Sequence, residues 1–191
     1  MSKSLIGGGT VRKLWPTEME KFRDHLLRLD TDSRRMRFGM AVDDGFIAAY
    51  AQRTDLARSV IYGYFTGGDM HAAAELRVIG EAWGPEAETA FSVEEAFQGS
   101  GVGTDLLGRI IIAARNRGIH RLYMNCLSEN RKMQRIARKF DAELQFDHGE
   151  VVGQVRTPGP TPASIWSEAI DDGNGFVMAV LDLPLRLLRA A

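Results

Sequence analysis

The fold is decided by residues 87–118, which begin Ala-Glu-Thr-Ala-Phe-Ser-Val-Glu-Glu-Ala-Phe-Gln-Gly-Ser-Gly-Val-Gly-Thr at 87–104. Within 87–93, Thr89, Phe91 and Val93 share one side and alternate with residues of the other side, which is the period of a strand. From Gly101 onward apolar residues recur at helical spacing, and Gly118 is a suitable helix stop. The stretch therefore predicts a strand, a glycine turn and a helix.

The turn at residues 98–104 predicts an anion site. Its three glycines, Gly99, Gly101 and Gly103, bring backbone N–H groups without bulky side chains to the positive end of a helix. Phosphate is the anion that such a loop most often binds. The alternative is a tight strand-to-helix turn with no ligand.

The spacing of the glycines separates the kinds of phosphate ligand. A P-loop needs Gly-Lys-Ser/Thr at its end, whereas Gly103 is followed by Thr104 and Asp105. A dinucleotide fingerprint needs glycine where Leu106 stands and an acidic residue near 123–125, where there is none. Both of these sites are disfavoured.

The pattern Gln-x-x-Gly-x-Gly, filled by Gln98, Gly101 and Gly103, resembles the acyl-CoA pyrophosphate loop of the GNAT superfamily of N-acetyltransferases. The resemblance covers roughly residues 10–157, and the run at 87–95 is most similar to the bacterial Pat-type protein-lysine acetyltransferases. It implies an α/β (α+β) fold, with a central mixed, mostly antiparallel sheet of about six to seven strands flanked by helices.

The resemblance implies acetyl-CoA as donor. The expected cofactor-binding residues are Phe91, Ser92, Val93, Gln98, Gly99, Ser100, Gly101, Val102, Gly103, Thr104, Asn125, Asn130 and Met133. Ser92, Val93 and Glu94 lie where the family strand bends away from its neighbour and exposes backbone groups to pantetheine. The Val93 N–H is the expected oxyanion donor.

Many superfamily members carry Asn-x-x-Ala-x-x-x-Tyr in the later helix, and its tyrosine protonates the departing thiolate. Asn130 and Met133 stand at the first two of these positions, and Ala137 at the third. The tyrosine is therefore missing, which leaves the general acid open. Cys126 is disfavoured as an acylated nucleophile because no histidine stands near it in the sequence.

Glu88 is the expected general base. A lysine with a pKa of about 10.4 is almost wholly protonated at neutral pH and needs help to lose its proton. Glu88 stands ten residues before Gln98, where the resembling lysine acetyltransferases carry their glutamate. The alternative is a structural Glu88 paired with an arginine, with Glu75 as second choice for the base. Glu94 and Glu95 are expected to face solvent.

Length and composition limit the function classes. A chain of 191 residues predicts one domain, and a net charge of −1 with a pI near 6.4 argues against a nucleic-acid binder. One cysteine excludes an internal disulfide, and four scattered histidines offer no metal-ligand spacing. The single cysteine suits a reducing cytoplasm, where we expect the protein, and no apolar run is long enough for a signal peptide or a membrane span. The oligomeric state, a dimer included, stays open.

The rest of the chain supplies the remaining elements. Residues 1–9 are an expected flexible end, 10–157 the acetyltransferase domain, and 158–191 a Pro-rich linker with a helical C-terminal extension. A capping-box pattern at Thr17 predicts a helix start. Pro184 argues against one unbroken final helix, so the extension is expected as two helical pieces. Further strands are expected at 10–15, 59–65, 70–79, 121–126, 142–146 and 151–155, and further helices at 17–30, 43–52 and 131–140.

The leading hypothesis is an acetyl-CoA-dependent N-acetyltransferase that acts on a primary amine, either a protein lysine or a small amine. The alternative is a non-catalytic acyl-CoA-binding sensor, which the missing tyrosine supports. The presence of Glu88 disfavours this alternative.

Overall fold

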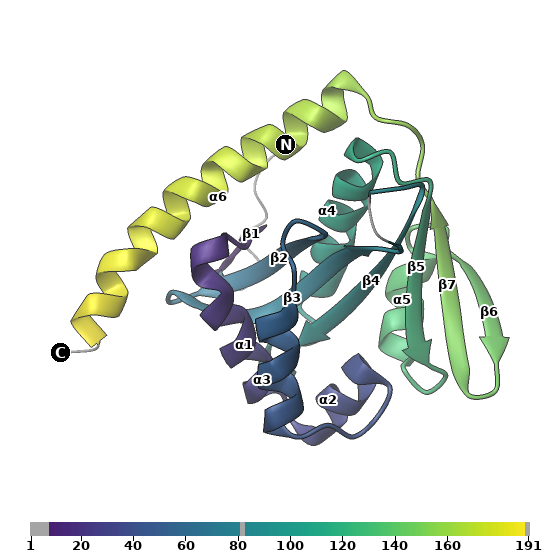
Figure 1. The fold of residues 1–191 in the computed structure, drawn as a ribbon, viewed down its shortest axis with the longest axis horizontal. Coiled ribbons are helices and arrows are strands. Elements are labelled where there is room, and N and C mark those ends of the chain that lie inside the picture. The colour runs from purple at the N-terminus through teal and green to yellow at the C-terminus, as the bar shows by residue number, and fades with distance from the viewer. Residues whose placement is uncertain (1–7, 81–82, 190–191) are drawn as a thin grey trace.

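A seven-stranded sheet with the order β1-β2-β3-β4-β5-β7-β6 forms the centre of the computed structural model, which describes residues 8–80 and 83–189 and the side chains as far as residue 179 (Figure 1). Neighbouring strands are antiparallel except for the parallel pair β4 and β5. The expected mixed, mostly antiparallel sheet is confirmed. The strands are β1 (Thr10–Lys13), β2 (Ser59–Thr66), β3 (Asp69–Val78), β4 (Glu86–Val93), β5 (Arg121–Leu127), β6 (Glu143–Asp147) and β7 (Glu150–Arg156).

Helices cover both faces of this sheet. One face packs against α4, whose Leu106 and Ile110 are fully buried, and the other against α1 and α3, through Phe22, Leu26 and Ile47. Alternate residues of β2 and β3 belong to the two clusters, as the period of a strand requires. The helices are η2 (Pro16–Glu18), α1 (Met19–Arg28), α2 (Thr31–Phe38), α3 (Asp44–Arg53), η3 (Glu95–Phe97), α4 (Val102–Asn116), α5 (Arg131–Arg138) and α6 (Pro162–Arg189).

Strand β4 separates from β5 soon after it begins. It pairs with β3 along 87–93 but with β5 only at 86–88. Figure 1 shows the two strands together at one end and diverging toward the other. The middle of the sheet therefore contains an open strand edge, with the glycine turn and the start of α4 beyond the end of β4.

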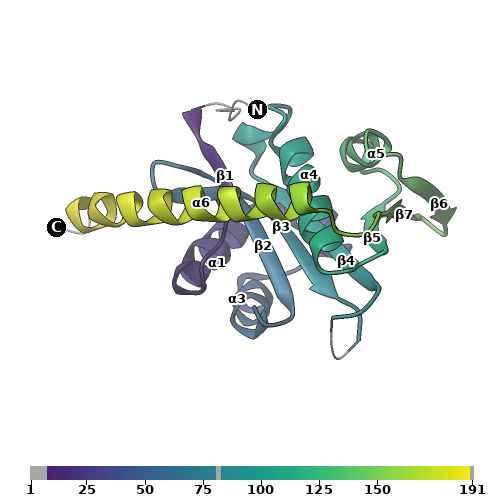
Figure 2. The ribbon, with the colours of Figure 1, turned by 90° about the horizontal axis from the view of Figure 1, so that it is seen from above.

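The expectation of two C-terminal helical pieces is wrong, because α6 is one continuous helix (Figure 2). It lies over α4 and β1, and Arg117 and Arg109 form ion pairs of 2.7 and 3.0 Å with Glu168 and Asp171. Gly175 lies against β1, where an added Cβ would be 3.2 Å from the Arg12 Cβ. The helix continues through this glycine and past Pro184, where the break was expected. Its packing on α4 and β1 offsets the roughly 3 kcal/mol that an interior proline costs relative to alanine.

The predicted capping box at Thr17 is also wrong. The chain first forms η2, and α1 begins at Met19 without a side-chain cap. Glu18 turns inward and is 8% exposed, and it accepts hydrogen bonds of 2.7 and 2.8 Å from Arg12 and 2.7 Å from Lys21. Thr17 lies inside η2 instead of before α1, so it cannot cap α1, and Glu18 also accepts from the Trp15 N–H at 3.4 Å at the start of η2.

Glu18 gives the fold a testable pH dependence. Burial alone would raise the pKa of Glu18, but hydrogen bonds from Arg12 and Lys21 outweigh it and lower the pKa from 4.5 to about 2. A depressed pKa means stabilisation that is present above pH 4.5 and lost as the pH falls toward 2. Glu18→Gln should lower the free energy of unfolding by about 3–5 kcal/mol at pH 7, because it removes the carboxylate that two buried cations share.

Urea unfolding at a series of pH values measures this effect. Glu20→Gln, an exposed change one residue into α1, is the matched control. The Glu18 variant should lose less stability than the control between pH 4.5 and 2. Parallel stability curves for the two variants would contradict the assignment.

Candidate active site

The glycine turn forms a row of free backbone donors. Gly99 and Gly101 have φ angles of 76° and 93°, a conformation that favours glycine. Thr104 and Asp105 make the first bonds of α4, at 3.0 and 3.1 Å to the Gly101 carbonyl. Among the described residues, no group accepts a hydrogen bond from the N–H groups of 99–103. Five free donors at a helix N-terminus suit a pyrophosphate.

The remaining side chains of the loop support this geometry. Ser100 Oγ donates to the Phe97 carbonyl at 2.6 Å, and Lys139 lies 3.5 Å from the Thr104 hydroxyl. The Val102 side chain is buried in the core, so only its backbone faces a ligand. A Cβ at Gly103 would be 2.9 Å from Ile136, so this glycine serves the packing of α4 on α5.

Gln98 braces the loop. Its Nε2 donates to the Val93 carbonyl at 3.0 Å, and its Oε1 accepts from Lys132 at 2.7 Å. The residue therefore ties the end of β4 to α5 and places a lysine beside the loop. Its side chain is engaged by protein groups on both ends.

The open edge of β4 presents alternate backbone groups. Glu94 N–H donates to the His71 carbonyl of β3 at 3.0 Å. Successive residues of a strand direct their backbone groups to opposite edges, so Ser92 also faces β3. Val93 and Phe91 then direct their N–H groups toward the gap beside β5. Of the three backbone positions expected at the open edge, Ser92, Val93 and Glu94, only Val93 therefore faces the gap, while Ser92 and Glu94 face β3.

A buried histidine holds the residues on both sides of Val93. His25 is fully buried, with Nδ1 3.0 Å from the Glu94 carboxylate and Nε2 2.8 Å from Ser92 Oγ. Burial lowers the pKa of His25 although the Glu94 carboxylate opposes this shift. The neutral ring therefore donates from Nδ1 to Glu94 and accepts from Ser92. His71 adds a bond of 2.8 Å to Glu94.

The expectation that Glu94 faces solvent is wrong. Its side chain is 14% exposed and also pairs with Arg28 at 3.0 Å. Burial would raise the pKa of Glu94, but hydrogen bonds from His25 and His71 lower it from 4.5 to about 2. Sequence reasoning missed both histidines, because no local pattern connects residues that are 69 and 23 positions from Glu94.

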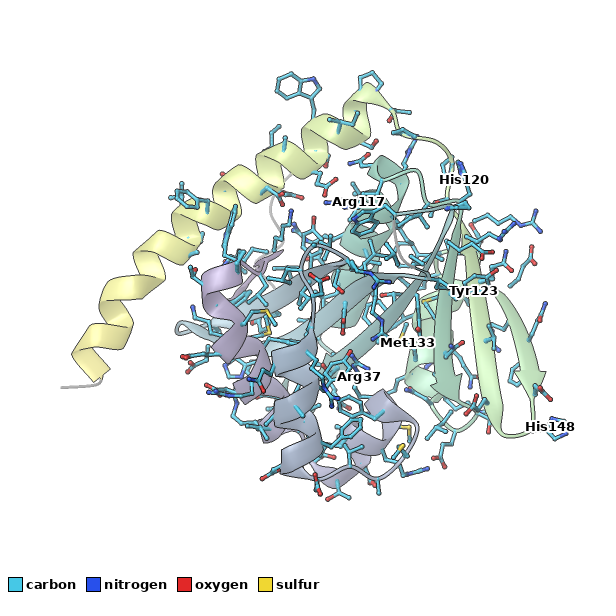
Figure 3. The ribbon with its side chains drawn as sticks, viewed as in Figure 1. Arg37, Arg117, His120, Tyr123, Met133 and His148 are labelled. Carbon is cyan, nitrogen blue, oxygen red and sulfur yellow. The ribbon has the colours of Figure 1, made fainter. Side chains whose placement is uncertain are left out.

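Glu88 and Glu75 lie in different surroundings on the sheet face opposite α4. The Glu88 side chain is 34% exposed, with only long contacts of 3.5 Å to Arg77 and 3.4 Å to Asn125. Glu75 is 4% exposed, lies 3.0 Å from Arg37 and accepts from Tyr50 at 2.5 Å. Figure 3 shows Arg37 reaching from α2 toward the sheet. Glu75 is thus occupied, and Glu88 is accessible.

The other predicted residues lie around β5 and α5. Asn130 caps α5 by accepting from the Met133 N–H at 3.0 Å, and the Met133 side chain, labelled in Figure 3, is buried in the core. Ala137, which replaces the tyrosine, is also buried. Cys126 is half-buried, and burial raises the pKa of its thiol, which disfavours a thiolate nucleophile.

Within residues 8–80 and 83–189, no group of three or more His, Cys, Asp or Glu side chains could hold a metal ion. No helix in the same part of the chain has the length and apolar character needed to cross a membrane.

Residues 9–142 match the model of the acetyltransferase (GNAT) family, which covers well over half of the chain. The chain belongs to the acetyltransferase (GNAT) family. Acetyl-CoA is the acetyl donor of this family, as the resemblance implied.

Individual relatives agree with this membership. The GNAT chain is 33% identical to the acetyltransferase Pat of Mycolicibacterium smegmatis over 86 residues, which cover 44% of this chain and 26% of that protein. It is similar to the GNAT domain of S. lividans PAT, with 26% identity, a TM-score of 0.67, and coverage of 78% and 90% of the two chains.

A more distant structure, yncA from Salmonella typhimurium with acetyl-CoA, shares the fold at 18% identity and a TM-score of 0.58, over 80% and 96% of the two chains. The GNAT chain matches only about a quarter, 26%, of the length of the acetyltransferase Pat of Mycolicibacterium smegmatis.

The loop makes a prediction about cofactor binding. Gly101→Glu places a negative charge beside the free amides, so acetyl-CoA should bind at least about tenfold more weakly than to Gly101→Ala. The alanine variant is the control because it shares the strain of the 93° φ angle without the charge. Calorimetry measures both affinities, and equal affinities would contradict a phosphate loop at this position.

Proposed function

We propose that the chain transfers the acetyl group of acetyl-CoA to a primary amine by direct attack, with Glu88 as general base. The main support for this proposal is the state of the Glu88 carboxylate. Its side chain is 34% exposed, its contacts are 3.4 Å or longer, and it lies on β4 where that strand separates from β5. An acceptor can reach this carboxylate. Glu75 lacks that freedom, since Arg37 and Tyr50 occupy it.

The reaction needs a base because the acceptor is protonated. Deprotonating an amine of pKa about 10.4 at neutral pH costs roughly 4–5 kcal/mol. Glu88 takes one proton from the ammonium, the nitrogen bonds to the thioester carbon, and the C–S bond breaks. The nitrogen loses its second proton to water, and the departing coenzyme A thiolate takes a proton from water, since Ala137 stands where the family tyrosine would be.

Backbone N–H groups on the open edge stabilise the oxyanion in this proposal. Glu88 and Val93 are about 17 Å apart along a strand, and Glu88 and Phe91 about 10 Å. The Phe91 N–H therefore suits the thioester oxygen, while the Val93 N–H suits the pantetheine arm. With Val93 as oxyanion donor, a relay of ordered waters would have to connect the acceptor to Glu88.

The acceptor is a protein lysine or a small amine. The similarity to Pat and to the S. lividans PAT domain supports a protein lysine. Replacement of the tyrosine by a buried Ala137 supports the second candidate, an acyl-CoA-binding sensor without turnover. A thiol-release assay with acetyl-CoA and a panel of amines and lysine peptides separates the two, because a sensor binds acetyl-CoA but releases no thiol.

Glu88→Gln tests the base. The variant keeps the shape and hydrogen bonding of the side chain but loses basicity, so turnover should fall by about 10²–10⁴-fold while acetyl-CoA affinity holds. Raising the pH toward the pKa of the amine should restore part of the rate, because more neutral amine is then available. The measurement is the pH–rate profile of thiol release.

Glu86→Gln is the matched control, on the same strand and face two residues earlier and paired with Arg121 at 2.5 Å. It should keep the parental rate. If Glu88→Gln and the parent had equal pH–rate profiles, Glu88 would not be the base.

A further inference from the structure

A cleft adjoins Glu88 on the face of the sheet opposite α4. Its volume is about 340 Å³, and it opens between the end of α3, the turn at 54–58 and the ends of β2 and β3. A small hollow next to it contains Glu88 and shares Tyr50, Glu75 and Arg77 with the cleft. A ligand in the cleft is therefore separated from the proposed base only by side chains that line both hollows.

The wall of this cleft carries three arginines, Arg53, Arg58 and Arg77. Arg58 and Arg77 are exposed, and no described residue accepts a hydrogen bond from the Arg58 guanidinium. The Arg58 backbone is fixed, because its N–H donates to the Asp55 carbonyl at 3.0 Å and its carbonyl accepts from Val78 at 3.1 Å. The cleft thus presents an unpaired cation on a fixed turn.

The acidic groups of the cleft are already engaged. Glu75 lies between Arg37 and Tyr50, at 3.0 and 2.5 Å. Asp55 accepts from the Ala57 N–H at 2.8 Å. Asp55 keeps its charge, but Arg53 and Arg58 outnumber it, so positive charge is left over in this part of the cleft, while Glu88 supplies negative charge in the adjoining hollow.

Arg77 stands between these two regions. Its guanidinium lies 3.5 Å from Glu88, and both side chains are partly exposed, at 50% and 34%. An exposed pair of this length is weak. An acceptor ammonium can replace Arg77 as the partner of Glu88, and a carboxylate on the same acceptor can then bind the released Arg77.

We propose that the acceptor is an amine with a carboxylate close by, which Arg77 and Arg58 bind while Glu88 receives the ammonium. The inference rests on the proposed function of Glu88 and adds the substrate class. A guanidinium matches a carboxylate through two parallel hydrogen bonds, which makes arginine well suited to this recognition. The carboxylate belongs either to an acidic residue beside an acceptor lysine or to a small amino acid.

Paired acceptors test the proposal and separate these two sources. One pair is a lysine peptide flanked by Asp and the same peptide flanked by Asn. The other is a free amino acid and its carboxamide. The ratio of kcat/KM within each pair, from thiol release, should favour the carboxylate by at least about fivefold in one pair, and the preference should weaken with salt.

Variants locate the preference. Arg58→Gln and Arg77→Gln should bring the ratio near one, and Arg58→Glu should favour a lysine peptide with basic flanks. Arg156→Gln is the matched control, because Arg156 is also an exposed arginine in a weak ion pair but lies on β7, away from the cleft. Its side chain is 75% exposed and lies 3.6 Å from Glu143, and the variant should keep the parental ratio.

The outcomes distinguish this inference from the proposed function. Equal kcat/KM within both pairs, or a preference that survives Arg58→Gln, would overturn the acidic acceptor while Glu88-dependent turnover still stood. Absence of thiol release with every amine would overturn the proposed function, and the acidic acceptor with it.

Discussion

The short pairing between β4 and β5 is the constraint on which the site depends. The two strands bond only at 86–88, so the backbone of β4 beyond Glu88 has a partner on one side alone. Unpaired N–H groups in the middle of a sheet are costly unless water or a ligand satisfies them. The amides of a pantetheine arm can act as the missing strand, and the free donors of 99–103 suit the pyrophosphate of coenzyme A.

Buried polar contacts keep this edge in one conformation. His25 connects Ser92 and Glu94, so the strand is held on both sides of Val93. Gln98 accepts from Lys132 and donates to the Val93 carbonyl, which fixes the turn to α5. A binding site for acetyl-CoA that is already ordered in the free protein loses less conformational entropy when the cofactor binds. The acceptor side differs, because Glu88 and Arg77 are partly exposed and free to exchange partners.

Much of this fold follows from local patterns in the sequence. Residues close together in the sequence determine the alternation at 87–93, the glycine turn and the apolar stripe of α4. The hairpins β2–β3 and β6–β7 can be predicted in the same way, from two strands joined by a short turn. The errors involve distant partners. Glu94 is buried by His25, Glu18 is drawn inward by Arg12, and α6 packs on β1 at Gly175 and continues past Pro184. Sequence spacing alone does not reveal such contacts.

Residue-resolved amide exchange by NMR, with and without saturating acetyl-CoA, tests the central claim most directly. In the free protein the Ser92 and Glu94 amides should be protected by β3, and the Phe91 and Val93 amides should exchange quickly. Acetyl-CoA should slow exchange at Phe91, Val93 and 99–103 and leave Ser92 and Glu94 unchanged. Unaltered exchange at Phe91 and Val93 in the saturated protein would contradict a donor site built on the open edge of β4.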